Sequence, residues 1–160
     1  TDPLGLTFMK DDYALSLELL DVRLIFEPEI AALASMHATP AQLTAIEKAC
    51  TEAEERIRQG LSYDDEDIQL HREIAAASGN RVIQNLVPII HSSIHQSINA
   101  STATADALRE QALTDHRRIV DCIKEHDAPG ARYAMIMHLA LNRDCILDRR
   151  VRSTKSIRQI

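Results

Sequence analysis

The chain has 160 residues, of which 45% are hydrophobic and 26% are charged, and its formal net charge is −6. This size fits one domain with one core, and no apolar run approaches the roughly 20 residues that cross a bilayer. The basic residues are spread along the chain except near its end, which argues against nucleic-acid binding through phosphates. Three widely spaced cysteines without a CxxC motif indicate reduced thiols. We therefore expect a single cytoplasmic domain over residues 1–160, with no membrane segment and no secretory signal.

Helical periodicity dominates the chain, and the few glycines and prolines mark where helices end. The predicted helices cover residues 11–37, 41–58, 64–78, 81–100, 107–126 and 131–151. In the first of these, Pro28 is expected to kink the helix or to divide it in two. Thr39 and Pro40 are typical of an N-cap followed by a first helical residue, and Gly60 provides a stop.

The later boundaries depend on the same kinds of signal. Asp64 or Asp65 is expected to cap the third helix, and Gly79 with Asn80 to end it. The polar tract 101–106 is predicted to be a loop, and residues 127–130 a turn. The sequence thus predicts an all-α fold, an antiparallel bundle of six or seven helices.

Four residues on three of these helices form a candidate metal site: Asp67, His71, His116 and His138. Asp67 and His71 are one helical turn apart, so they project from one face. His116 and His138 each occupy a position in the apolar repeat of a later helix. Buried carboxylates and imidazoles are costly without partners, and a divalent ion would remove that cost. The donor set suits Zn²⁺ best, with Ni²⁺, Mn²⁺ and Fe²⁺ as alternatives, and lacks the thiolates of many closed structural zinc sites.

Each of these histidines also has a plainer interpretation as a hydrogen-bonded core residue. The Asp-x-x-x-His pair could equally be an exposed polar contact on a helix. Their joint placement on inward faces of three helices favours a metal. Four protein ligands would leave open positions on an ion of higher coordination, so the site would suit a sensor or a catalyst.

Several short motifs in a defined order resemble one known family. They are the runs 19–28 (LLDVRLIFEP), 67–71 (DIQLH), 78–80 (SGN), 115–120 (DHRRIV) and 137–139 (MHL). Together, over nearly the whole chain, they resemble the C-terminal effector-binding (FCD) domain of GntR-type transcription regulators, in its metal-binding branch. The resemblance implies that Asp67, His71, His116 and His138 bind the ion.

The resemblance also implies what the cavity is for. A small carboxylate or hydroxycarboxylate would bind beside the metal or onto it, and its arrival would change how attached winged-helix domains hold DNA. That N-terminal DNA-binding domain is absent from this chain, so DNA would be a partner only of the full-length protein. A homodimer is expected, because such regulators transmit ligand binding through dimer arrangements.

Three further residues are predicted to bind the effector. Arg23 occupies the motif position of an arginine that faces the effector in this family, and a guanidinium binds carboxylates through two hydrogen bonds. Its alternative is a surface ion pair with Glu27. Asn142, one turn beyond His138, could bond an effector oxygen or be a plain boundary residue. His95, paired with His91 on the fourth helix, could contact the effector or support the metal ligands.

Two classes of function fit these features. The first is a metal-dependent sensor domain, which we predict. The second is a small helical metalloenzyme in which a metal-bound water acts as the nucleophile. No general base can be assigned for it, because Asp67 is already used as a ligand. We therefore predict that the chain is not an enzyme; a purely structural metal would bind tightly without any small-molecule response.

Overall fold

The computed structural model describes residues 4–6, 12–95 and 102–157. Within these ranges the helices are α1 (Asp12–His37), α2 (Pro40–Arg58), α3 (Asp64–Ala77), α4 (Arg81–His95), α5 (Thr102–Lys124) and α6 (Ala128–Ile157). The same ranges contain no strand. The predicted all-α bundle is therefore confirmed, with six helices in the described part of the chain.

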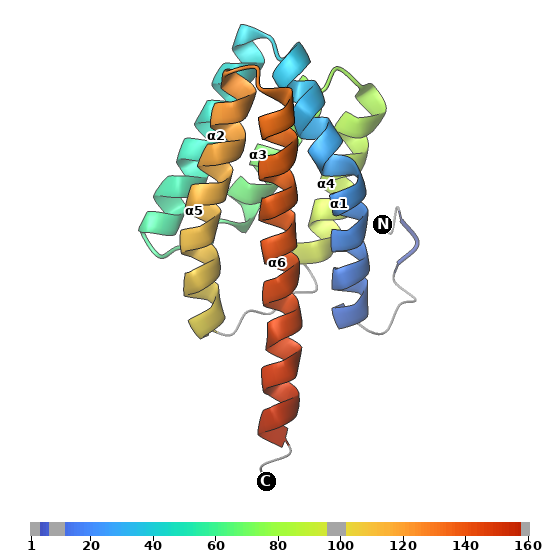
Figure 1. Ribbon diagram of the computed structural model, residues 1–160, viewed down its shortest axis with the longest axis vertical. Helices are drawn as coiled ribbons and strands as arrows, with labels where there is room; N and C mark the ends of the chain where they lie inside the picture. The colour runs from blue at the N-terminus through green and yellow to red at the C-terminus, as the bar shows by residue number, and fades with distance from the viewer. Residues whose placement is uncertain (1–3, 7–11, 96–101, 158–160) are drawn as a thin grey trace.

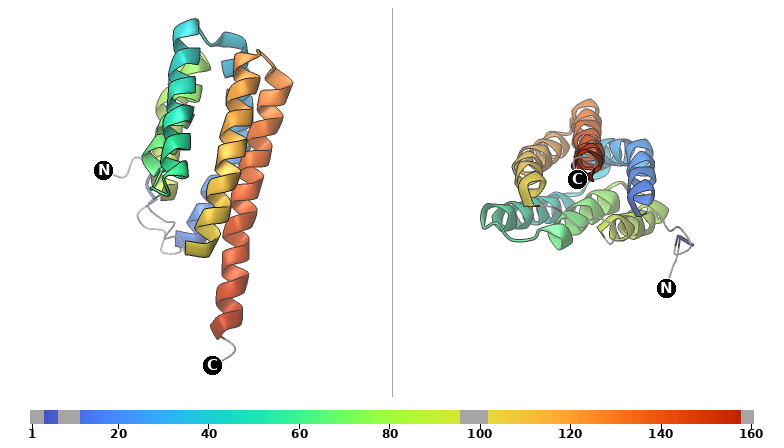
Figure 2. Two further views of the ribbon diagram at one scale, coloured as in Figure 1. Left: turned by 90° about the vertical axis from the view of Figure 1, so that its left-hand side faces the viewer. Right: turned by 90° about the horizontal axis from the view of Figure 1, so that it is seen from below.

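The helices form two layers that run alongside each other (Figures 1 and 2). One layer contains α5, α6 and α1, with α6 in contact with both neighbours, and the other contains α2, α3 and α4. The layers meet where α1 packs on α3 and α4 and where α2 packs on α5. The C-terminal part of α6 extends beyond the other helices (Figure 1). None of the described helices is both long and apolar enough to cross a membrane.

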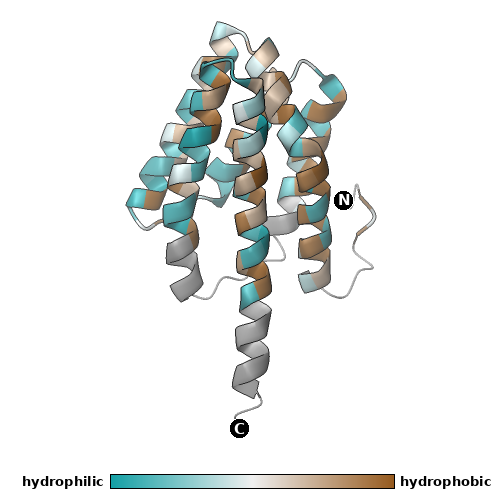
Figure 3. Cartoon of the chain, viewed as in Figure 1, coloured by the Kyte–Doolittle hydropathy of each residue, from teal (hydrophilic) through white to brown (hydrophobic). Residues whose placement is uncertain are grey.

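The helix α1 is continuous, although Pro28 lies inside it. A proline removes one backbone hydrogen bond, so the sequence predicts a break or kink here. However, α1 packs against α3, α4, α5 and α6, and hydrophobic residues are prominent along it (Figure 3). Burial of Leu20, Ile30 and Ala34 on this helix outweighs the lost bond, and α1 is not divided.

The predicted start of α2 is confirmed by a reciprocal cap. The Thr39 Oγ1 accepts from the Gln42 backbone N–H at 3.2 Å, while the Gln42 side chain accepts from the Thr39 N–H at 2.9 Å. The stops are confirmed too, because Gly60 and Gly79 have φ values of 70° and 79°, which favour glycine. The predicted cap of α3 is wrong: Tyr63 is the N-cap residue and makes no side-chain cap bond.

Two predicted connections turn out to be helical. Residues 102–106, predicted as a loop, form the first turns of α5, because this tract has no glycine or proline and alternates alanine with polar residues. Residues 128–130, predicted as a turn, begin α6, since proline fits a first helical turn. Asp127 caps that turn by accepting from the Gly130 N–H at 2.9 Å. The predicted end of the fourth helix, 96–100, lies outside the described residues.

Candidate metal centre

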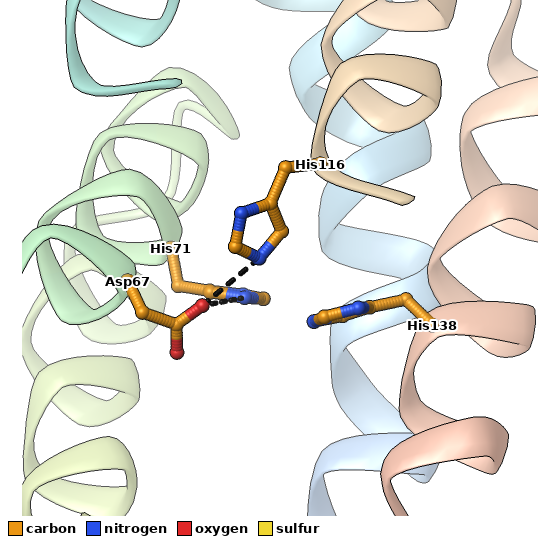
Figure 4. Close-up of side chains that lie close together, drawn as sticks. All are labelled: Asp67, His71, His116 and His138. Atoms are coloured by element: carbon orange, nitrogen blue, oxygen red, sulfur yellow. Dashed lines mark ion pairs between the residues drawn. The ribbon is translucent and has the colours of Figure 1, made fainter. Parts of the chain in front are cut away.

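The four predicted ligands converge between three helices. Asp67 and His71 project from α3, His116 from α5 and His138 from α6, and Figure 4 shows their side chains directed toward one another. One ligand atom from each residue lies within 4.8 Å of those of the others. All four side chains are buried. The structure therefore brings the whole predicted set together, while its binding of a metal stays a prediction.

Asp67 turns inward because of its register on α3. The first turn of this helix carries Asp64, Asp65, Glu66 and Asp67, and negative charge is favourable near a helix N-terminus. Asp64 and Asp65 are exposed, whereas Asp67 lies on the buried face with Leu70, His71 and Ile74. Helical spacing alone thus selects one carboxylate of four for the interior.

The contacts inside the cluster leave imidazole nitrogens unsatisfied. His116 Nε2 lies 3.0 Å from Asp67 Oδ1, and His71 Nε2 lies 3.7 Å from the same oxygen. The ring centroids of His116 and His138 are 5.0 Å apart. Among the residues that the structure describes, His116 Nδ1 has no hydrogen-bond partner, and the carboxylate oxygens nearest to His116 Nε2 (3.0 Å) and His138 Nδ1 (3.5 Å) do not meet hydrogen-bond geometry. Unpaired buried polar atoms of this kind are rare, and a bound ion would account for them.

Burial also sets the protonation state of two of the histidines, His71 and His138. Desolvation lowers the pKa of His71 to about 4 and that of His138 to about 4, and this effect exceeds the attraction of the neighbouring carboxylates. Both imidazoles are therefore neutral at pH 7, each with a lone pair on one ring nitrogen. Neutral imidazole is the form that binds metals, so His71 and His138 are in the form that can act as ligands.

A buried carboxylate that the sequence suggested only as a surface partner of Arg23 supports this cluster. Glu27 on α1 accepts from Arg23 Nε at 2.7 Å, contacts His91 Nε2 at 2.7 Å, and lies 2.7 Å from His71 Nδ1. Burial by itself would raise the pKa of Glu27, but the charge of Arg23, with the two histidines, holds that pKa well below its usual range. Glu27 shares a helical stripe with Leu20, Arg23 and Ala34, which is a signal that could have found it.

Arg23 makes the ion pair with Glu27 that was the alternative to effector binding, but not at the surface. The two side chains are only 4% and 5% exposed, so the expectation of a surface pair is wrong. Arg23 Nη2 also lies 3.4 Å from His71 Nε2, which places the guanidinium beside the candidate metal ligands. A role of Arg23 in effector binding stays a prediction.

The remaining predicted residues are placed as follows. Asn142 is half-buried, and its Nδ2 lies 3.5 Å from His138 Nε2, at the edge of the cluster. His95 is the last residue of α4, and its side chain lies outside the described part of the structure. His91, one helical turn before His95, is buried, with its ring centroid 4.3 Å from that of His71.

Asp115, which the sequence did not single out, is buried with Oδ2 3.5 Å from His138 Nδ1.

The comparisons with known proteins identify the family. The family model of the FCD domain matches residues 18–141. This chain belongs to the FCD domain family. FCD domains are the effector-binding domains of GntR-type transcription regulators, so the resemblance in the sequence motifs is confirmed.

Relatives and a solved structure agree with this assignment. The galactonate operon transcriptional repressor of Escherichia coli (strain K12) is 30% identical over 121 residues, covering 75% of this chain and 52% of the relative. An Escherichia coli (strain K12) protein named as a regulator of the L-lactate dehydrogenase operon is 32% identical over 143 residues, covering 84% of this chain and 52% of the relative. The structure of Streptococcus agalactiae GntR matches with a TM-score of 0.81 at 32% identity, covering 90% of this chain and 65% of that one.

This FCD domain spans about half the length of the curated relatives that it matches. The relatives are named for transcription regulation and not for a catalysed reaction. The metalloenzyme alternative therefore finds no support among these relatives.

Proposed function

We propose that this FCD domain is the ligand-sensing part of a bacterial transcription regulator, and that it binds one divalent metal ion and a small organic acid in its core. The observation that carries the proposal is the buried convergence of Asp67, His71, His116 and His138, with ring nitrogens that have no hydrogen-bond partner among the described residues. A divalent ion would pair with these nitrogens and with the carboxylate together.

Zinc is the ion that the donor set favours, with nickel, manganese or iron as alternatives. Three imidazoles and one carboxylate are borderline to hard donors that all these ions accept. Cys50, Cys122 and Cys145 are not members of the ligand group. The open coordination positions of an ion bound by four protein ligands would accept an oxygen of the effector.

A carboxylate or hydroxycarboxylate is the effector class that the surroundings favour. Arg23 and Asn142 flank the cluster, and a guanidinium with an amide provides hydrogen-bond donors for carboxylate and hydroxyl oxygens. The names of two relatives refer to the galactonate and L-lactate dehydrogenase operons, and galactonate and lactate are both hydroxycarboxylates. Such acids can coordinate a metal through a carboxylate and a hydroxyl oxygen together.

Occupancy of the core would be transmitted through α1 and α4 in a homodimer that also carries DNA-binding domains. Both helices reach the centre, α1 through Arg23 and Glu27 and α4 through His91. The effector must bind two arrangements of the protein with different affinity, since otherwise it cannot shift their populations.

The first test is metal content, measured by elemental mass spectrometry on protein purified without chelator or metal-affinity resin. We expect close to one equivalent of metal in the parent and little in a His116→Ala, His138→Ala double variant. A His37→Ala variant is the control, because His37 is exposed at the end of α1. Absence of metal from the parent, even after reloading with Zn²⁺, Ni²⁺ or Mn²⁺, would contradict the proposal.

The second test is the response to small acids. Lactate, galactonate and citrate are screened by thermal shift against the zinc-loaded and the metal-free protein. We expect at least one acid to stabilise the zinc-loaded form more than the metal-free form. Tight zinc binding with no response to any acid would instead indicate a purely structural metal.

A further inference from the structure

We infer that Glu27 is a positioning residue for the metal centre: its carboxylate fixes the ring tautomer of His71 and holds Arg23 beside that ligand. The inference rests on the proposed metal site and deepens it. Glu27 is not among the four candidate ligands and lies on α1, a helix that contributes none of them. Glu27 would therefore influence metal binding through its contact with His71.

Three side chains share the one buried carboxylate of Glu27. Glu27 Oε1 lies 2.7 Å from Arg23 Nε and 2.7 Å from His91 Nε2. Oε2 lies 2.7 Å from His71 Nδ1 and 3.4 Å from Arg23 Nη2. An arginine only donates hydrogen bonds, and an ionised carboxylate only accepts them. Each nitrogen that contacts Glu27 must therefore carry a proton.

The two nitrogens of a neutral imidazole differ, because one carries a proton and the other a lone pair. A proton on His71 Nδ1 therefore leaves the lone pair on Nε2, the atom that lies 3.4 Å from Arg23 Nη2 and 3.7 Å from Asp67 Oδ1. Glu27 in this way selects the tautomer that offers a lone pair to the cluster. A metal-binding histidine whose second nitrogen donates to a carboxylate is a common way to orient the ring.

Glu27, His71 and His91 form a second grouping of possible ligands. Both oxygens of Glu27 already contact nitrogens of Arg23, His91 or His71, so neither oxygen is left to bind a second ion. The grouping therefore supports the first site and is not a second metal site.

The decisive measurement is the tautomer of His71 in the metal-free protein at pH 7. Long-range ¹H–¹⁵N correlation spectra of the histidine rings distinguish the two protonated forms, and a His71→Asn variant identifies the signal. We expect His71 to be protonated at Nδ1 in the parent and to populate the other tautomer in Glu27→Gln, because an amide can donate as well as accept. Protonation of the parent at Nε2 would overturn the inference.

The second measurement is zinc affinity, by competition with a chromophoric chelator. We expect Glu27→Gln to weaken zinc binding by about 10-fold to 100-fold, as for other residues that orient a metal ligand. Glu54→Gln is the matched control, because Glu54 is also buried and also holds an arginine, Arg117, at 2.8 Å, and it belongs to neither candidate ligand group. Its zinc affinity should equal that of the parent.

Glu27→Gln leaves the charge of Arg23 buried without its partner, which is strongly destabilising. An Arg23→Gln, Glu27→Gln double variant removes both charges and tests zinc affinity where the single variant does not fold. Parental zinc affinity in a folded Glu27 variant would refute the positioning role. If the parent itself binds no zinc, the proposed function fails, while the tautomer of His71 still decides the role of Glu27.

Discussion

A His116→Phe substitution distinguishes a metal ligand from an ordinary core histidine. His116 is 0% exposed, and neither ring nitrogen has a hydrogen-bond partner among the described residues. Each unsatisfied buried polar group costs about 1–3 kcal/mol, and a slightly larger ring in a packed core costs about 1–3 kcal/mol. These effects oppose each other, and loss of the contact between His116 Nε2 and Asp67 Oδ1 at 3.0 Å adds a cost of about 1 kcal/mol. Without metal we therefore expect the free energy of unfolding to stay within about 2 kcal/mol of the parent.

Zinc should stabilise the parent more than the His116→Phe variant. At a free zinc concentration of about 1,000 times the parental Kd, the parent gains about 4.1 kcal/mol of stability. If the loss of one ligand weakens binding about 100-fold, the variant gains only about 1.4 kcal/mol at the same concentration. For a domain of this size, 1 kcal/mol changes Tm by about 2–4 °C, so the parent should gain about 8–16 °C and the variant about 3–6 °C.

The assay is urea unfolding followed by circular dichroism, with chelator and with excess zinc. His37→Ala should respond to zinc as the parent does, because that side chain is exposed. A loss of more than about 3 kcal/mol in the metal-free Phe variant, with no effect of zinc on the parent, would contradict a ligand role of His116. That result would make His116 a packing residue.

Three further predictions concern stability and reactivity. Burial lowers the pKa of His71 and His138 from 6.5 to about 4, so the unfolded chain takes up protons first as pH falls. Stability of the metal-free protein is then complete above about pH 6.5 and decreases toward pH 4, by up to about 3 kcal/mol for each histidine; urea midpoints that do not change over this range would contradict the assignment. Burial raises the pKa of Cys50 to about 12, so iodoacetamide at pH 8 should label Cys50 only after unfolding, as peptide mass spectrometry would show. Thr39→Ala should lower the stability measured by thermal unfolding by about 1 kcal/mol, because it removes the helix cap. Thr44→Ala, inside the same helix, is the control, and an equal effect of the two substitutions would show that the cap does not stabilise the protein.

Local signals in the sequence were sufficient for most of the helix boundaries. Thr39 with Gln42, Gly60 and Gly79 act on backbone groups within one turn of themselves, so their effect can be predicted without knowledge of the fold. The tract 102–106 is polar and therefore predicted to be a loop, but it is helical, because a tract without glycine or proline permits a helix.

The candidate metal ligands were predictable for the same reason. Asp67 and His71 share a helical face by spacing, and His116 and His138 lie in apolar repeats, so each was expected to face inward. Sequence periodicity determines the direction of a side chain relative to its own helix. The number of helices that meet at one point, and which side chains meet there, depend on packing.

Only the tertiary structure placed Glu27 and Asp115 behind the ligands. In sequence, Arg23 and Glu27 form an i, i+4 pair that fits a solvated helix surface equally well. In the fold, α1 packs against α3 and α4, so the same pair is buried against His71 and His91. The Arg23–Glu27 pair can orient His71 only because other helices exclude water around it. A charge buried in this way needs hydrogen-bond partners from the protein in place of water.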